Sequence, residues 1–260
     1  MKIIFMGATK FSEEMLSYLL INKFEIKAIF TIPRKFHISY SEKQIKNYNY
    51  ADLRHIARHN DLKIYEVNSV AEKRITDYYE VIKEIGPEII LVLGWYYMVP
   101  KKIRELAKYG AWGIHASLLP KYAGGAPLVW AMIHGEKETG VTLFKLDEGV
   151  DDGDIIGQKS FSIEFEDTIK EVYEKAIEAS REILVKALSG IDRIELKPQM
   201  KSKIELYPQR EPGDGEIDLS KTSFEIYNFI RAQSFPYPGA FIRTKDGKKL
   251  IIEKARIEDE

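Results

Sequence analysis

The chain has 260 residues, 45% of them hydrophobic, which is enough for one large or two small domains with a sizeable core. Its 39 Lys and Arg against 40 Asp and Glu leave a net charge of −1, so the total charge gives no sign of a polyanionic partner. The absence of cysteine excludes disulfides, thiolate nucleophiles and cysteine-based metal sites. No run of about 18 apolar residues occurs, and the first residues read as a strand, so we expect a cytoplasmic protein that does not bind a membrane.

The N-terminal residues predict a strand, a helix and a second strand. Residues 2–7 are apolar, residues 8–23 have apolar side chains at helical spacing, and residues 25–33 read as a strand again. The first turn lacks the G-x-G-x-x-G pattern, so no dinucleotide site is predicted. Free backbone N–H groups at the helix start would let Thr9 and Lys10 meet an anionic group of a substrate; an ordinary strand-to-helix turn is the alternative.

Residues 34–60 are polar and predict a long excursion, of the kind that often contacts a substrate, before a helix at 51–60. His55 and His59 are four residues apart, as two zinc ligands on a helix would be. No Glu follows the first histidine and no third ligand is evident, so we interpret both as surface residues.

The next segments predict a strand at 62–67, a helix at 70–85 and a buried strand within 87–100 that runs into an aromatic loop. The loop residues Gly94, Trp95, Tyr96 and Tyr97 follow this strand. If the sheet is parallel, they lie on the same rim as His115, which follows a later strand; an aromatic packing cluster is a compatible reading.

Residues 111–120 form an apolar run followed by a loop rich in Gly and Pro. This pattern predicts a buried strand with His115 at its carboxyl end, where open α/β sheets bind their ligands. A buried, hydrogen-bonded core histidine is the alternative.

A second strand, 141–146, leads into an acidic loop at 147–154. If the two strands are neighbours, a carboxylate of this loop can reach the His115 imidazole, hold its tautomer and raise its pKa, which suits proton transfer near neutral pH. Alternating carboxylates with Gly also suit calcium, but the spacing does not follow the EF-hand order and lacks its closing Glu. We therefore predict no metal.

The remaining chain predicts a strand at 155–163 and a long amphipathic helix at 167–190. A charged linker with Pro and Gly follows, so we expect a large domain, 1–206, and a short C-terminal subdomain, 207–260. The subdomain should contain one helix and a hairpin that turns at Asp246-Gly247.

The segments IHASLLPKYAGGAP and ETGVTLFKLDEGVDDGD resemble the formyltransferase family that uses 10-formyltetrahydrofolate. That family has an Asn-x-His motif, a Ser-Leu-Leu-Pro loop and an Asp in a Gly-rich loop. The resemblance covers most of the chain, including QREPGDGEID and PYPGA near its end. It implies an α/β fold with a mostly parallel, Rossmann-like sheet, flanking helices and a small helix and hairpin segment at the C-terminus.

The resemblance also implies site residues. His115 and Asp151 fall on two members of the family's catalytic trio, and Gly113 stands at the position of the third, Asn. The residues implied to bind the folate are Gly94, Trp95, Tyr96, Ser117, Leu118, Leu119, Glu148 and Val150.

Two positions depart from the family pattern. Gly113 has no side-chain amide to hydrogen-bond the formyl oxygen, and Ala123 replaces the Arg of the loop. Two small replacements indicate a pocket reshaped around glycine, so we expect Gly113→Asn to slow the reaction rather than restore it.

The function implied is transfer of a formyl group from 10-formyltetrahydrofolate, as cosubstrate, to an amine. A nucleotide-linked amino sugar is the preferred acceptor, because it needs only a local cation pocket and a stacking aromatic; Thr9, Lys10 and Arg210 are the predicted contacts. Methionyl-tRNA is the alternative acceptor, although the charge gives no phosphate-binding surface for nucleic acid. A formyl-folate hydrolase, a non-catalytic folate-binding relative and a homodimer remain open.

Overall fold

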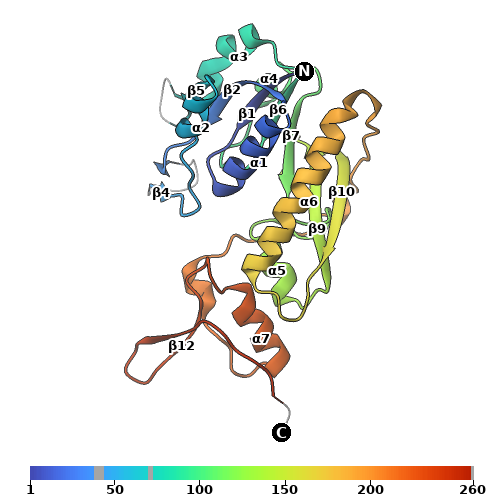
Figure 1. The fold of residues 1–260 in the computed structure, drawn as a ribbon. Coiled ribbons are helices and arrows are strands. Elements are labelled where there is room, and N and C mark those ends of the chain that lie inside the picture. Colours follow the sequence, from blue (N-terminus) through green and yellow to red (C-terminus); the bar gives the residue numbers. More distant parts are fainter. Residues whose placement is uncertain (38–43, 70–72, 259–260) are drawn as a thin grey trace. The chain divides into compact units, whose positions relative to one another are not determined.

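The structure is a computed structural model that describes residues 1–37, 44–69 and 73–258 (Figure 1). The chain forms two compact units, each assembled from three segments. They are Met1–Ile114, Leu143–Ile156 and Leu184–Lys197 for the first unit, and His115–Thr142, Gly157–Ile183 and Pro198–Glu260 for the second.

The largest sheet has seven strands, and four of its neighbouring pairs run parallel. The strands are β1 (Lys2–Met6), β2 (Glu25–Thr31), β5 (Lys63–Glu66), β6 (Ile89–Val92), β7 (Ala111–His115), β9 (Glu138–Lys145) and β10 (Ile155–Ser162). Their order is β10-β9-β7-β6-β1-β2-β5. The pairs β5/β2, β2/β1, β1/β6 and β6/β7 are parallel. The predicted α/β class with a mostly parallel sheet is confirmed.

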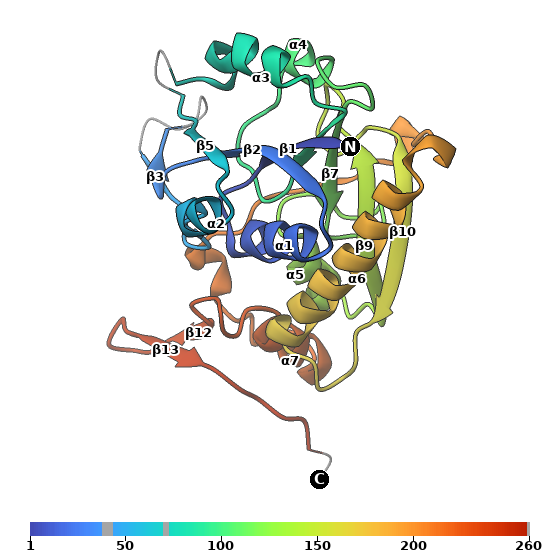
Figure 2. The same cartoon turned by 45° about the horizontal axis from the view of Figure 1, so that its top comes forward.

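Helices lie on both faces of the strands of the first unit. They are α1 (Lys10–Ile21), α2 (Arg54–His59), α3 (Tyr79–Ile85) and α4 (Lys101–Arg104). Figure 2 shows α3 and α4 on one face of β1 and β2, and α1 on the opposite face. Parallel strands covered in this way are buried on both sides, which is why their sequences are continuously apolar rather than alternating.

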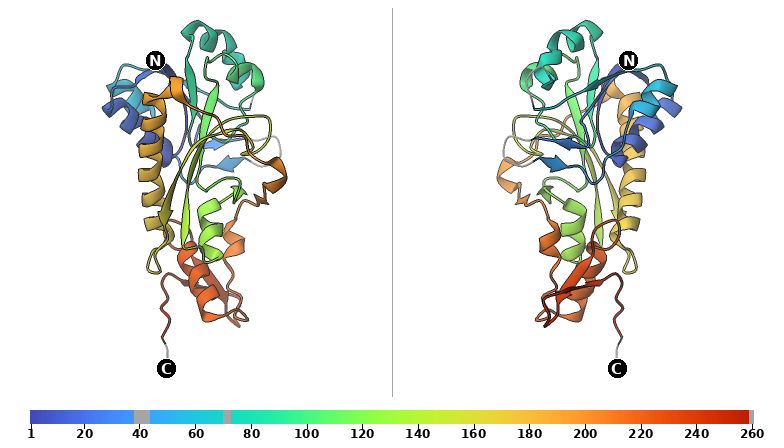
Figure 3. Two further views of the ribbon diagram at one scale, coloured as in Figure 1. Left: turned by 90° about the vertical axis from the view of Figure 1, so that its right-hand side faces the viewer. Right: turned by 90° about the vertical axis from the view of Figure 1, so that its left-hand side faces the viewer.

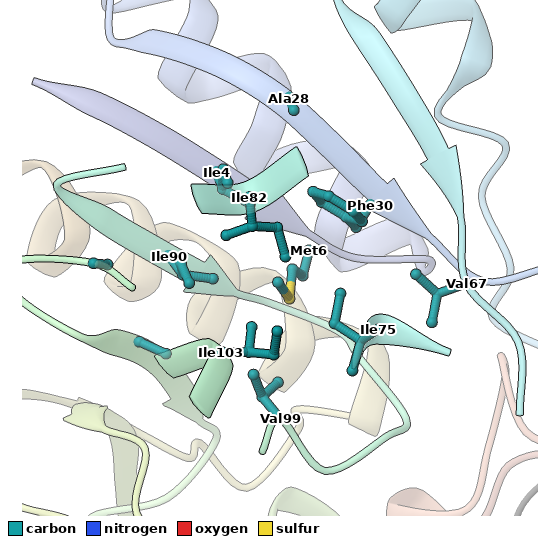
Figure 4. Packing of buried hydrophobic residues seen from close by; sticks show 12 residues of the cluster. Ile4, Met6, Ala28, Phe30, Val67, Ile75, Ile82, Ile90, Val99 and Ile103 are labelled. Carbon is teal, nitrogen blue, oxygen red and sulfur yellow. The ribbon is translucent and has the colours of Figure 1, made fainter. Parts of the chain in front are cut away.

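The core of the first unit lies between the sheet and α3. Met6 and Phe30 from the strands meet Ile82 from α3 and Ile103 from α4, all fully buried (Figure 4). Successive side chains of a strand point to opposite faces. Phe5, which follows Ile4 and precedes Met6, is therefore on the other face, where α1 buries Met15, Leu16 and Leu19.

The excursion at 34–60 is partly ordered by short elements. The two-residue strands β3 (Lys35–Phe36) and β4 (Ile45–Lys46) pair antiparallel, and α2 ends the segment. Residues 38–43 of the excursion lie outside the described residues. His55 and His59 are exposed, as predicted.

The helix predicted at 70–85 is shorter and begins as a tighter turn. A 3-10 turn, η1 (Ile75–Tyr78), precedes α3, and Gly86 ends that helix in the left-handed conformation with a φ of 60°. Arg74, just before η1, is extended and therefore not helical. Residues 70–72 of the prediction lie outside the described residues.

The second unit contains the loop after β7 and most of the C-terminal segment. Its elements include β8 (Ala123–Gly124), α5 (Pro127–Ile133), η3 (Lys201–Lys203), β11 (Leu206–Tyr207), η4 (Pro212–Gly215), α7 (Ser223–Ala232), β12 (Ala240–Arg243) and β13 (Lys249–Ile252). Helices α5 and α7 lie side by side (Figure 3). The strands β12 and β13 form the predicted hairpin, whose turn has Gly247 at a φ of 79°.

The predicted long amphipathic helix is α6 (Ile169–Ser189), which ends just before Gly190; η2 (Ile191–Arg193) follows. Within the second unit it packs on β10, where Lys159 pairs with Glu182 at 2.8 Å. No helix among the described residues is long and apolar enough to cross a membrane. The division at 206/207 stays a prediction.

A buried arginine fixes α7 to the loop before α6. The Arg231 guanidinium donates to the carbonyls of Glu164 and Asp167, both at 2.8 Å, and to Asn228 Oδ1 at 2.9 Å. Burial lowers the pKa of Arg231, and the nearby Tyr227 and Asp167 oppose this shift. Because its donors are satisfied by oxygens, this charge holds together two parts of the second unit that are far apart in sequence.

The turn between β1 and α1 is held by one buried hydroxyl. Ser12 Oγ accepts from the backbone N–H groups of Ala8 and Thr9, both at 3.0 Å, and donates to the Leu93 carbonyl at 2.6 Å. The Lys10 N–H donates to the Asn49 carbonyl at 2.8 Å. These N–H groups therefore have protein partners, and the contact of this turn with an anionic group stays a prediction.

Replacing Ser12 by Ala should lower the free energy of unfolding by about 1–3 kcal/mol, because it leaves buried backbone groups without a partner. Urea denaturation measures the change. Ser17→Ala on the same helix is the matched control, since no hydrogen bond of its hydroxyl occurs among the described residues, and it should change stability by less than about 0.5 kcal/mol. Equal losses in the two variants would contradict the role given to Ser12.

Candidate functional site

His115 is the last residue of β7, at the carboxyl end of a parallel strand as predicted. Its side chain is buried, with 8% exposed, and Nε2 lies 2.7 Å from the carbonyl oxygen of Tyr122. A carbonyl can only accept, so this contact assigns the ring proton to Nε2. In the neutral imidazole the lone pair then belongs to Nδ1.

The loop that follows His115 is clamped by two polar side chains of the neighbouring strands. Thr142 Oγ1 donates to the Ser117 carbonyl at 2.6 Å and accepts from the Leu119 N–H at 3.0 Å. Gln158 Nε2 donates to the Leu119 carbonyl at 2.9 Å. Ser117 Oγ donates in turn to the Lys121 carbonyl at 2.6 Å. The backbone of the predicted folate loop is therefore rigid.

Thr142 and Gln158 were not among the predicted site residues. Thr142 is fully buried, and a hydroxyl inside the apolar strand VTLFKL is the one sequence signal that points to such a role, because a buried hydroxyl needs a partner. No comparable signal marks Gln158, whose strand is otherwise unremarkable in sequence.

The next part of the loop depends on residues in the left-handed conformation. Tyr122 has a φ of 55° and Ala126 a φ of 48°. Gly124, with a φ of 91°, lies against β11: a Cβ at this position would come within 2.5 Å of the Tyr207 carbonyl oxygen. Ala123 is fully buried and pairs with Leu206. The glycine is needed here for the close approach of two backbones.

Side chains of the first unit occupy the space beside Gly113. It lies inside β7, paired with Val92, and its φ is outside the left-handed region. A Cβ at Gly113 would lie 3.0 Å from Leu146 Cδ2 and 3.3 Å from Phe144 Cε1. The restriction at this position is therefore lack of space and not backbone strain.

The acidic loop after β9 is tight. Its ends are joined by the Lys145 N–H, which donates to the Asp154 carbonyl at 2.9 Å, and Leu146 N–H donates to the Ala111 carbonyl of β7 at 2.8 Å. A Cβ at Gly153 would overlap the Lys145 carbonyl oxygen. Asp151 is left-handed, with a φ of 52°. The strands β7 and β9 are neighbours in the sheet.

The remaining loop residues implied to bind folate, Glu148 and Val150, are exposed. Asp151 and Gly113 belong to the first unit and His115 to the second. The structure describes each unit by itself, so the pairing of His115 with Asp151 stays a prediction.

The aromatic loop after β6 packs against the turn before α1. Gly94 has a φ of 70°, and a Cβ there would overlap the Thr9 hydroxyl. The Thr9 side chain is itself buried and caps α1 by accepting from the Ser12 N–H at 3.2 Å. Thr9 therefore has a structural role, and the predicted substrate contacts of Thr9 and Lys10 stay predictions.

Asn47 connects the excursion to this aromatic loop. It is buried, donates to the Ala8 carbonyl at 2.9 Å and accepts from the Tyr96 hydroxyl at 3.0 Å. Burial raises the pKa of Tyr97, the next aromatic, to about 12. Trp95 Nε1 is buried, and no hydrogen-bond acceptor for it occurs among residues 1–37, 44–69 and 73–258.

Arg210 is held by protein contacts. Its guanidinium donates to the Asp214 carbonyl at 2.6 Å and to Gln233 Oε1 at 2.9 Å, and it lies 4.8 Å from the ring centre of Trp130. Burial lowers the pKa of Arg210. Its predicted contact with the substrate stays a prediction.

A pocket of about 240 Å³ opens in the second unit. Its lining residues are Lys121, Tyr122, Glu136, Lys203, Glu205 and Tyr207. The Tyr122 hydroxyl donates to Glu136 Oε1 at 2.8 Å, and burial, followed by this contact, raises the pKa of Tyr122. Sequence reasoning did not identify this pocket, because its residues come from three segments. Within the described part of the chain, no group of three or more His, Asp or Glu residues could hold a metal ion.

Two family models match the chain: formyl transferase over residues 1–188, and formyl transferase, C-terminal domain, over residues 210–260. Curated relatives include the methionyl-tRNA formyltransferase of Caldanaerobacter subterraneus, which is 32% identical over 99% of this chain and 81% of that protein. The methionyl-tRNA formyltransferase of Clostridium tetani is 33% identical over 100% of this chain and 81% of that protein.

Solved structures include sugar N-formyltransferases. WlaRD, a sugar 3N-formyltransferase solved in the presence of dTDP and 5-N-formyl-THF, is 25% identical with a TM-score of 0.66, and the match covers 91% of this chain and 80% of that one. The N-formyltransferase of Helicobacter canadensis, in complex with folinic acid and dTDP-3-aminofucose, is 26% identical with a TM-score of 0.68, over 91% and 81% of the two chains.

The packing at Gly113 predicts that Gly113→Ala lowers the free energy of unfolding by about 1–3 kcal/mol, as overpacking does. Gly113→Asn should cost more, since more atoms must be accommodated. Gly213→Ala is the matched control, because a Cβ there meets no atom within 4 Å. Chemical denaturation measures all three variants.

The double variant Gly113→Ala/Leu146→Ala separates a clash from other causes. Trimming Leu146 makes room for the new methyl group, so the double variant should lose less stability than the sum of the two single losses. Strict additivity of the two losses would contradict the clash.

Proposed function

This chain belongs to the formyl transferase family, and we propose that it transfers the formyl group of 10-formyltetrahydrofolate to the amine of a nucleotide-linked amino sugar. Two sugar N-formyltransferase structures with 25% and 26% identity support the donor, because they were solved with formylated folates.

The chemistry asks for a base and an oxyanion donor. The acceptor nitrogen attacks as the free amine, a C–N bond forms to the formyl carbon, and the bond to the folate nitrogen breaks as tetrahydrofolate leaves. In this sequence the acceptor nitrogen loses one proton and the departing folate nitrogen gains one, so a single group that takes up the first proton and returns it balances the step. We assign that proton to His115 Nδ1, because Nε2 already donates to the Tyr122 carbonyl. Asp151 is the carboxylate proposed to orient and support this imidazole.

Gly113 stands at the position of the third trio member, and hydrophobic side chains occupy the space beside it. Phe144 and Leu146 occupy the space beside Gly113, so an amide does not fit there without displacing them. A backbone N–H or a water would have to supply the missing donor to the oxyanion. One such donor is worth roughly 3 kcal/mol in the transition state, so the way it is replaced sets the rate.

The preference for a nucleotide-linked sugar over transfer RNA as acceptor rests on the charge of the chain. Residues 207–260 hold nine Lys and Arg against ten Asp and Glu, and the whole chain has a net charge of −1. Affinity for transfer RNA rests largely on neutralising backbone phosphates, which needs a basic surface. A nucleotide-linked sugar carries few phosphates and needs only a few local cations.

Methionyl-tRNA is the second candidate acceptor. It is favoured by sequence, because curated methionyl-tRNA formyltransferases are 32% and 33% identical over 99% and 100% of this chain. The discriminating experiment incubates the protein and 10-formyltetrahydrofolate with dTDP-3-aminofucose, with methionyl-tRNA, or with no acceptor, and follows tetrahydrofolate release. Release only with methionyl-tRNA would overturn the sugar proposal, and release without any acceptor would indicate a hydrolase.

His115→Asn and Asp151→Asn should each reduce formyl transfer by about a hundredfold or more, the contribution of a general acid or base. Asn tolerates the left-handed conformation of residue 151, so that variant changes the charge and keeps the backbone. His59→Asn and Asp147→Asn, which alter exposed residues, are the controls. Turnover near the wild-type value in either test variant, with folding intact by circular dichroism, would remove that residue from the mechanism.

Binding of transfer RNA should be weak and should disappear by about physiological salt, because few phosphates can be neutralised. A filter-binding or anisotropy titration across a salt series measures this. Tight binding that persists at high salt would favour the second candidate.

A further inference from the structure

The pocket in the second unit is formed by three segments whose side chains have different chemistry. Lys121 and Tyr122 come from the loop after β7, Glu136 follows α5, and Lys203, Glu205 and Tyr207 come from the segment around η3 and β11. The volume of about 240 Å³ is below the roughly 300–1,000 Å³ typical of pockets for a whole drug-sized ligand. It fits one part of a larger ligand.

The two carboxylates of the pocket are engaged with tyrosines. Glu136 accepts from the Tyr122 hydroxyl at 2.8 Å, and Glu205 accepts from the Tyr207 hydroxyl at 3.5 Å. Neither Lys121 nor Lys203 forms an ion pair with any residue in the described ranges. Accepting these hydrogen bonds leaves both carboxylates charged, so the lining holds two anionic and two cationic groups. The two ammonium groups without an ion pair are the ones that an anion such as a phosphate would meet.

Aromatic rings form one wall of the pocket. The ring centres of Tyr122 and Tyr207, which both line the pocket, are 4.9 Å apart, and the Trp130 ring lies 5.7 Å from the Tyr207 ring. Aromatic side chains stack on nucleobases, an interaction that tolerates different bases. A ring system and a phosphate beside each other are the two features of a nucleotide.

We infer that this pocket binds the nucleotide part of the acceptor, with the base against Tyr207 and the phosphates at Lys121 and Lys203. The inference rests on the proposed function and names the part of the protein that would recognise its acceptor. Tyr122 connects the pocket to the candidate base, since its carbonyl lies 2.7 Å from His115 Nε2. A nucleotide in the pocket would therefore contact the residue that orients the imidazole.

Calorimetric titration of the full chain with dTDP tests the inference. Lys121→Ala and Lys203→Ala should each raise the dissociation constant about tenfold, the effect of losing one charge-assisted contact. Lys254→Ala is the matched control, because this lysine is exposed in the same unit, outside the pocket and without an ion pair among described residues, and its dissociation constant should equal that of the wild type.

Two further variants test the aromatic wall without changing charge. Tyr207→Phe keeps the ring and should bind dTDP within about twofold of the wild type, whereas Tyr207→Leu should bind about tenfold more weakly. The β8/β11 pairing uses backbone groups, so both variants retain it. Thermal denaturation confirms that each variant folds.

Three results would overturn the inference: no binding of dTDP to the wild-type protein, equal affinity in wild type and both lysine variants, or inorganic phosphate binding as tightly as dTDP. Lysine-dependent binding of transfer RNA without binding of dTDP would assign the two lysines to nucleic acid instead. If dTDP-3-aminofucose is formylated equally by all lysine variants, the pocket is wrong and the proposed function stands. If dTDP binds as inferred but no acceptor is formylated, the proposed function is wrong and the pocket stands.

Discussion

The candidate site depends on two hydrogen bonds made by the hydroxyl of Thr142. This hydroxyl donates to one carbonyl of the loop after β7 and accepts from an N–H two residues later, so two buried backbone groups obtain partners from a single side chain. The loop can then leave the strand without exposing apolar residues to water or burying unpaired amides. The same loop continues to Tyr122, whose carbonyl lies 2.7 Å from His115 Nε2.

The elements of the first unit could be predicted because their physics is local. Buried parallel strands are continuously apolar, and α1 has apolar residues at helical spacing, so β1, α1 and β2 follow from the sequence. The side chains that position the site could not be predicted. Asn47, Ser12 and Gln158 act on backbone groups remote in sequence, and no period or motif marks such contacts.

The relatives compared with this chain are named formyltransferases, but their names give different acceptors. Curated relatives named for methionyl-tRNA and solved relatives named for sugars match the same fold. The loops after β6, β7 and β9 each contain a glycine where a Cβ would overlap a neighbour: the Thr9 hydroxyl at Gly94, and a backbone carbonyl at Gly124 and Gly153. These constraints act on the backbone of the loops and do not depend on the acceptor. We therefore expect the residues that distinguish one acceptor from another to be side chains rather than parts of these backbones.

Tyr122 contacts His115 through its main chain and lines the pocket through its side chain. The acceptor of the imidazole N–H is a main-chain oxygen, which every residue type supplies, whereas the hydroxyl and ring of Tyr122 line the pocket. A substitution at position 122 can thus change the lining of the pocket and keep the carbonyl that accepts from the His115 N–H. The new residue must tolerate the left-handed backbone at this position. If His115 is the base, as proposed, this arrangement would allow an evolving protein to change its acceptor while keeping that base.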